Sequence, residues 1–268
     1  MKKFLFQTYE ATAFAWSALR ANVFRTILSL LGVTVGIFSI IGVYTMVDSL
    51  EGSIKNSLNS IGEKTIYVDK WPWQFGEGEY PWWKYFRRPY STYSEYTFLK
   101  EKLRNAEAVS FSAGANTTVQ FGSNSYKGTN LTGVTYTYKD VYDVPVQKGR
   151  FFTESEINGS RNVAIIGEKV ANTLFPNSEP IGKEIKIKGA KFVVIGIFEL
   201  EGEGLFEIAS KDEAAMIPYG SFTKLFFVGK NGIEPSIAVK GLESDIGMIA
   251  LENELIGSLR AKRGLKPT

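Results

Sequence analysis

The sequence contains no cysteine and no histidine in its 268 residues. Disulfide bonds, thiol nucleophiles, imidazole bases and cysteine–histidine zinc sites are therefore excluded, as is Ser–His–Asp catalysis. The phosphate-binding loop G-x-x-x-x-G-K-[ST] is also missing, because the Gly-Lys pairs at 182–183 and 229–230 are followed by Glu and Asn. We therefore expect a non-catalytic chain with no cofactor or metal site of its own.

The net charge of the chain is also small, +3 at pH 7. Lys and Arg total 31 against 28 Asp and Glu, and aromatic residues make up 14%, which excludes a globally disordered chain. Residues 1–47 hold 4 of the basic and 1 of the acidic side chains, so residues 48–268 hold 27 of each. The large portion has no basic excess, and we expect no nucleic-acid partner.

One long apolar run lies near the N-terminus. From Thr26 to Val47, 22 residues pass without a charge, which as a helix gives roughly 33 Å, enough to cross a hydrocarbon core of about 30 Å. The positive-inside rule then predicts a cytoplasmic N-terminus, with the residues after about 47 across the membrane. The alternatives are a buried core helix and a cleaved signal peptide. The first is disfavoured because the run is apolar all round, the second because the run starts late and no A-x-A-like site follows it.

The segment before the span, residues 1–23, is predicted to form an interfacial helix on the cytoplasmic membrane surface. Aromatic side chains are interleaved there with a few charges, a pattern typical of helices that lie along lipid headgroups. The alternative is that these residues form the cytoplasmic start of one long helix.

Small residues gather on one side of the span, residues 24–47. Ser29, Gly32, Gly36 and Ser39 fall on a helical face about 80° wide. Such a stripe lets another membrane helix approach closely, so we predict a packing face for a further span. The plainer explanation is that glycine is common in membrane helices. Residues 48–61 are predicted to extend the helix as a stalk that Gly62 ends.

Four of the five tryptophans lie between residues 71 and 90: Trp71, Trp73, Trp82 and Trp83. Two glycines and three prolines in the same stretch predict a loop. Exposed, these aromatics would offer a contact surface for lipid headgroups or a partner protein. The alternative is a loop that tucks its aromatics onto its own domain.

The rest of the chain alternates strand and helix patterns, which predicts an α+β domain. Strands are expected at 64–69, 109–113, 117–121, 130–135, 162–166, 184–187, 191–198, 214–218 and 236–239. Helices are expected at 94–106, with a Thr92/Glu95 capping pair, and at 138–143, 168–175 and 244–263. The acidic pairs Glu77/Glu79, Glu201/Glu203 and Asp212/Glu213 are read as solvated loop charges or a weak cation site rather than as catalytic groups.

Two stretches resemble the MacB/FtsX-type ABC transporter permeases. The stretch from Leu19 to Gly62 is similar to the start of these permeases: Arg-Thr entering a span with paired glycines, then a stalk helix ending in glycine. Gly149–Glu199 resembles their periplasmic core domain in the order and spacing of five short motifs. These are G-R-x-F-[T/S] at 149–153, V-A-x-I-G at 163–167, L-F at 174–175, P-I-G-K at 180–183 and F-x-V-I-G at 192–196.

The resemblance implies a four-span permease of the bacterial inner membrane, with Thr268 just before the second span. It implies a separate ABC ATPase subunit that binds ATP and Mg, a second permease copy, and, in tripartite members, a periplasmic adaptor and an outer-membrane channel. The ectodomain would have two subdomains, 149–230 inserted between 62–148 and 231–268.

The function implied is mechanotransmission, in which ATP-driven movement passes through the stalk to expel a drug, peptide or lipid-linked cargo. The alternatives are a regulator of the same family, which activates a cell-wall hydrolase or releases lipoproteins, and a single-span binding or sensor protein.

Overall fold

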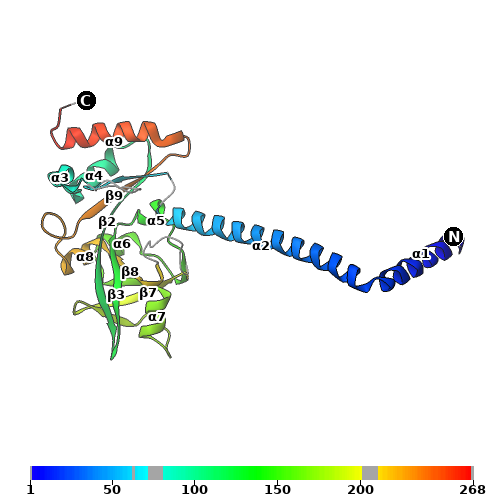
Figure 1. The fold of residues 1–268 in the computed structure, drawn as a ribbon. Coiled ribbons are helices and arrows are strands. Elements are labelled where there is room, and N and C mark those ends of the chain that lie inside the picture. The colour runs from blue at the N-terminus through cyan, green and yellow to red at the C-terminus, as the bar shows by residue number, and fades with distance from the viewer. Residues whose placement is uncertain (1, 62–63, 72–80, 201–210, 267–268) are drawn as a thin grey trace. The chain divides into compact units, whose positions relative to one another are not determined.

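The computed structural model describes residues 2–61, 64–71, 81–200 and 211–266. The chain divides into two units, Met1–Ile54 and Lys55–Thr268. The first contains helix α1 (Lys2–Ala21) and most of helix α2 (Val23–Ile61). The second contains a nine-stranded sheet and the shorter helices (Figure 1).

Helices α1 and α2 are separated at a single turn residue, Asn22. The Thr26 hydroxyl sits at this junction and donates to the carbonyls of Asn22 and Leu19, at 3.2 and 3.3 Å. Residues 1–23 therefore do not simply begin one long helix. Helix α2 then runs without interruption for 39 residues.

The second unit alternates short strands and helices. The strands are β1 (Thr65–Val68), β2 (Ala106–Phe121), β3 (Asn124–Val134), β4 (Val146–Gly149), β5 (Val163–Ile166), β6 (Glu184–Ile187), β7 (Ala190–Phe198), β8 (Ala214–Pro218) and β9 (Pro235–Gly241). The helices are α3 (Trp82–Tyr85), α4 (Tyr93–Lys102), α5 (Tyr138–Val141), α6 (Glu154–Asn158), α7 (Glu168–Leu174), α8 (Tyr219–Leu225) and α9 (Ile249–Lys262). The 3₁₀ turns are η1 (Lys211–Glu213) and η2 (Ile246–Met248).

The strand order is β1-β9-β2-β3-β8-β5-β7-β4, and β6 pairs with both β2 and β7. The pairs β3–β8 and β5–β7 are parallel and the others antiparallel. Because β6 connects β7 back to β2, the six strands β2, β3, β8, β5, β7 and β6 form a closed ring. Strand β2 belongs both to this ring and to the sheet β1-β9-β2. Its residues 106–113 pair with β9, and its residues 119–120 pair with β6.

The side chains of the sheet β1-β9-β2 point alternately to its two faces, and other elements cover both faces. Val109 and Phe111 of β2 pack with Leu99 of α4 and Leu251 of α9, and α4 and α9 lie together in Figure 1. On the other face Ala108 packs with α5. The ring strands build the largest core, which is completed by α7 and α8.

The α+β fold class is confirmed, together with the capping box in which Thr92 and Glu95 begin α4. Three expectations need correction. Residues 109–113 and 117–121 belong to one strand, β2, because Gly114–Asn116 keep pairing with β3. Residues 71–90 are not wholly loop, since α3 forms within them. The last helix begins at Ile249 rather than near Ser244, because Gly247 and Met248 have φ of 77° and 56°.

Candidate membrane and partner-contact surfaces

Within the described part of the chain, one helical segment is long and apolar enough to cross a membrane, Val23–Gly52, with a mean hydropathy of 2.3. Two threonine hydroxyls in this helix are satisfied locally. The hydroxyls of Thr34 and Thr45 donate to the carbonyls of Leu30 and Ile41, at 2.8 and 2.9 Å. Since the backbone groups of a helix are also paired internally, the segment suits a hydrocarbon environment.

The predicted packing face lies open on this helix. Ser29, Gly32, Gly36 and Ser39 are all exposed, and a Cβ added at Gly32 or Gly36 would meet no atom within 4 Å. The chain itself therefore leaves room for a second helix against these residues. Whether another span occupies this face stays a prediction.

Helix α1 carries its aromatics outward. Tyr9, Phe14 and Trp16 are exposed, and the guanidinium of Arg20 lies 5.6 Å from the centroid of the Trp16 ring. Exposed aromatic rings with a nearby cation suit the headgroup level of a bilayer. The interfacial placement of this helix stays a prediction.

The tryptophan-rich segment divides into a tucked part and an exposed part. Trp71 is half-buried, and its indole nitrogen donates to Glu234 at 2.9 Å. Trp82 and Trp83 are 57% and 55% exposed and meet edge to face, with ring centroids 6.1 Å apart. Trp73 lies outside the described residues. Trp71 is thus tucked onto its own domain, whereas contact of the exposed Trp82 and Trp83 with lipid headgroups or a partner protein stays a prediction.

A buried lysine beside the segment was missed in the sequence. Lys70 is 6% exposed, its ammonium donates to the Tyr90 hydroxyl at 2.9 Å, and it lies 4.1 to 5.1 Å from the ring centroids of Tyr90, Trp71 and Phe86. The rings attract the cation through their negative faces. Lys70 thus fixes the two ends of the segment to each other. Its lysine-then-aromatic sequence is too common to have signalled this.

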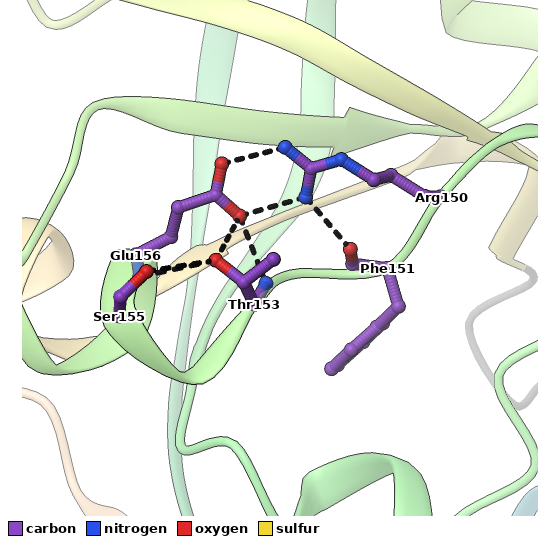
Figure 2. A network of polar contacts seen from close by, with 5 residues as sticks. All are labelled: Arg150, Phe151, Thr153, Ser155 and Glu156. Atoms are coloured by element: carbon purple, nitrogen blue, oxygen red, sulfur yellow. Dashed lines mark hydrogen bonds and ion pairs between the residues drawn. The ribbon is translucent and has the colours of Figure 1, made fainter.

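The G-R-x-F-[T/S] motif forms a compact polar network (Figure 2). The Arg150 guanidinium donates twice to the Glu156 carboxylate, at 2.8 and 2.7 Å, and once to the Phe151 carbonyl at 3.1 Å. The Glu156 carboxylate also accepts from the backbone N–H and the hydroxyl of Thr153, which caps α6. The Arg150 hydrogen bonds, followed by those of Thr153, lower the pKa of Glu156 to about 2.

Two glycines of the motifs, Gly149 and Gly167, occupy positions where a larger side chain would collide with neighbouring backbone. Gly149 has φ of 85°, a conformation that favours glycine, and an added Cβ there would collide with the Ile195 carbonyl of β7. At Gly167 a Cβ would collide with the Asp212 carbonyl. Gly149 and Gly167 therefore allow backbone segments to approach each other closely.

Among the described residues lies one of the three acidic pairs, Asp212/Glu213. Asp212 is buried rather than solvated, which corrects the expectation for this residue, while Glu213 is paired with Lys169 at 3.2 Å. Glu77, Glu79, Glu201 and Glu203 lie outside the part that the structure describes. No group of three or more metal-ligating side chains occurs among the described residues.

A family model described as the MacB-like periplasmic core domain matches residues 26–257. The chain belongs to this family. The MacB-like sequence motifs thus coincide with the elements that the structure shows, from the capped turn at Thr153 to strand β7.

Relatives of known name agree with this family. The chain is 30% identical over 209 residues to the macrolide export ATP-binding/permease protein MacB of Chlorobium luteolum, covering 76% of this chain and 30% of that protein. It is 29% identical over 218 residues to the pyoverdine export ATP-binding/permease protein PvdT of Pseudomonas syringae pv. tomato, covering 79% and 31%. The chain thus spans about a third of the length of these relatives.

Two solved structures share the fold. The periplasmic region of MacB from Actinobacillus actinomycetemcomitans superposes with a TM-score of 0.60 at 20% identity, covering 80% of this chain and 91% of that one. The extracellular domain of the ABC-type transporter YknZ from Gram-positive bacteria gives 0.54 at 24% identity, covering 66% and 86%. Both likenesses agree with the family match in showing the fold of the MacB-like periplasmic core domain.

Proposed function

We propose that this chain transmits ATP-driven movement from the inner membrane to its periplasmic ectodomain, in an ABC transporter that exports a drug, peptide or lipid-linked cargo. The observation that carries the proposal is the unbroken helix α2, which contains the candidate span and continues to Ile61, four residues before strand β1. A continuous helix is a stiff connection, so displacement at one end reaches the other.

ATP and Mg would bind to an ABC ATPase, which we propose to be a separate subunit; the 268 residues of this sequence contain no phosphate-binding loop. A second permease copy would pack along the face that contains Gly32 and Gly36. The N-terminus would be cytoplasmic and the ectodomain periplasmic, as the charges flanking the span favour. A periplasmic adaptor and an outer-membrane channel would complete the export route. The relatives' printed names, which refer to macrolide and pyoverdine export, support this direction of transport.

The test breaks the stiffness of helix α2 at a position beyond the candidate span, which ends at Gly52. Proline at Ser57, inside α2, removes one helical hydrogen bond and kinks the helix at a cost of about 3 kcal/mol, whereas Ser57→Ala leaves it intact. The assay uses the complete transporter in nanodiscs with a spin label at Ser178→Cys, an exposed position of the otherwise cysteine-free ectodomain.

With Ser57→Ala, ATP and vanadate should change the label-to-label distance between two copies. With Ser57→Pro, ATP hydrolysis should persist while that change disappears. An ATP-driven change that survives Ser57→Pro at full amplitude would show that the movement does not pass through this helix, and the proposal would then fail.

A further inference from the structure

An exposed surface around α3 combines aromatic rings with positive charge. Trp82, Trp83 and Phe86 are 57%, 55% and 64% exposed. From Pro81 to Ser94 the sequence has three basic residues and no acidic one, and all three basic residues are exposed. We call this the aromatic–basic surface; it consists of Trp82, Trp83, Lys84, Phe86, Arg87 and Arg88.

The three exposed rings of this surface lie against one another. Trp82 meets Trp83 and Phe86 edge to face, with ring centroids 6.1 and 6.4 Å apart. Trp82 and Phe86 are four positions apart, so they lie on the same side of the helical turn. The rings therefore form one continuous apolar patch rather than scattered exposed residues, and such patches mark sites that bind a protein or a membrane.

The other side of the segment is attached to its own domain. Tyr85 is half-buried, and the guanidinium of Arg88 lies 4.4 Å from its ring centroid. The ammonium of the buried Lys70 lies 5.1 Å from the ring centroid of Phe86 and donates to the Tyr90 hydroxyl. The exposed rings thus stand on an anchored base. Because the base is already ordered, binding through these rings loses little conformational freedom.

We propose that the aromatic–basic surface docks on the anionic lipid headgroups of the membrane that α2 crosses. Tryptophan rings favour the headgroup level of a bilayer, and anionic lipids attract Lys and Arg. Interfacial binding grows both with the apolar area buried and with this attraction, and the surface offers the two together. The ectodomain then has a membrane contact of its own besides the span. This contact goes beyond the proposed function and rests only on α2 crossing the bilayer.

A short stretch of chain connects this surface to the candidate span. Gly52, the last residue of the span, precedes Lys70 by 18 positions, and Lys70 lies against Phe86 of the surface. Such a length of chain keeps the surface within a few tens of ångströms of the bilayer. The headgroups are therefore present at high effective concentration, and a modest attraction suffices for docking. A partner protein that is free in solution lacks this advantage, which is why the bilayer is the favoured occupant.

The absence of cysteine allows a single reporter to be placed in the surface. Trp83→Cys carries the environment-sensitive dye NBD on the purified full chain, in nanodiscs whose lipids bear a doxyl quencher on the acyl chain near the headgroup. In phosphatidylglycerol nanodiscs we expect blue-shifted, strongly quenched emission, and in phosphatidylcholine nanodiscs much weaker quenching. Ser178→Cys, an exposed position between α7 and β6, is the matched control and should show neither change.

Charge reversal tests whether the lipid charge is what the surface recognises. Each basic residue close to an anionic membrane strengthens binding about fivefold. Arg87→Glu should therefore lower the ratio of docked to undocked chain by about fivefold or more, and high salt should weaken the quenching of the unreversed chain. Lys186→Glu, at an exposed position of β6, changes the net charge by the same amount and should leave the quenching unaltered.

The purified chain is assayed without an ATPase, so the result does not depend on the proposed function. Equal quenching in the two lipids, or quenching that persists in Arg87→Glu, overturns recognition of anionic headgroups. No quenching at position 83 in either lipid overturns the membrane contact and assigns the surface to a partner protein. An ATP-driven distance change with Ser57→Ala would leave the proposed function standing in each of these cases, and its absence would leave the docking untouched.

Discussion

The guanidinium Nε of Arg263 donates to the carboxylate of Glu95 at 2.6 Å, joining residues 168 positions apart. Glu95 begins α4 as part of its capping box and is 6% exposed, while Arg263 directly follows α9. Burial opposes ionisation of Glu95, but the hydrogen bonds from Arg263 and Thr92 outweigh it and lower its pKa. The last helix is thereby fixed to the helix that follows the tryptophan-rich segment.

Arg263→Met should destabilise the ectodomain, because it leaves a buried carboxylate with only its capping partners. We expect a loss of about 1 to 3 kcal/mol, less than for a fully buried pair because Arg263 is partly exposed. Lys102→Met, at an exposed position of α4, is the control and should change the free energy of unfolding by under about 0.5 kcal/mol. Urea unfolding of the full chain in detergent measures both. Equal midpoints for the two variants would contradict the prediction.

The Arg150–Glu156 pair predicts a pH-dependent contribution to stability. The folded pKa of Glu156, about 2, lies below its ordinary value. The stabilisation is therefore complete at pH values above the ordinary carboxyl pKa and is lost as pH falls towards 2. Because half of the Arg150 side chain is exposed, solvent screening limits the contribution to about 1 kcal/mol.

Glu156→Gln isolates the contribution of the carboxylate charge to stability, because glutamine can still complete the capping box. At pH 7 the variant should unfold at lower urea concentration than the wild type, and the difference should shrink steadily between pH 4.5 and pH 2.5. A difference in unfolding free energy that stays constant over this range would show that the carboxylate charge is not the stabilising feature.

Tyr90→Phe tests the buried lysine. The change removes the hydroxyl that accepts from Lys70 but keeps the ring beneath the ammonium, so an unsatisfied cation remains at a buried position. We expect a loss of about 1 to 2 kcal/mol in unfolding free energy.

The chain offers a matched control at its surface, where the exposed Lys139 donates to the Tyr136 hydroxyl at 3.0 Å and lies 4.4 Å from the ring centroid. Tyr136→Phe should be nearly neutral because water replaces the lost partner. Similar losses at the two tyrosines would mean that burial of Lys70 does not matter.

Gly32→Leu and Gly36→Leu should abolish the ATP-driven distance change described above while leaving ectodomain unfolding unchanged. Apart from the helix's own nearby backbone, a Cβ at either position meets nothing within 4 Å, so we attribute the expected effect to another helix that the leucine displaces. Thr34→Leu, on the opposite side of α2, is the control and should retain the change. An unaltered ATP-driven distance change in both glycine variants would contradict the prediction that this face packs against another helix.

Much of the fold could be predicted from local pattern. The apolar run in α2 is long and uninterrupted, and the Thr92/Glu95 capping box specifies where α4 begins. The motifs of residues 149–199 identified the family before any geometry was known. These features are readable because each depends on residues close together in the sequence.

Other features depend on distant residues and gave no local signal. Strand β6 has only four residues, and nothing in them shows that it pairs with both β2 and β7. Helix α6 was missed although Thr153 and Glu156 form a capping box, because a five-residue helix lacks the hydrophobic period. Lys70 and Arg263 read as ordinary surface cations; only the folded chain brings aromatic rings or a buried carboxylate to them.

The register of β1 against β9 determines how the ectodomain responds to being pulled. Thr65, just after α2, pairs with Lys240, just before the turn into α9, so the chain enters and leaves at the same end of this antiparallel pair. Force that separates α2 from α9 would therefore open the ladder one hydrogen bond at a time, beginning with the bond from the Gly241 N–H to the Lys64 carbonyl, instead of loading all its bonds at once. The ion pair between Lys64 and Glu243 lies at the end where the ladder would open, and it holds the two strands together there. Drawing α2 and α9 apart therefore loads this strand pair in the direction in which its hydrogen bonds break singly.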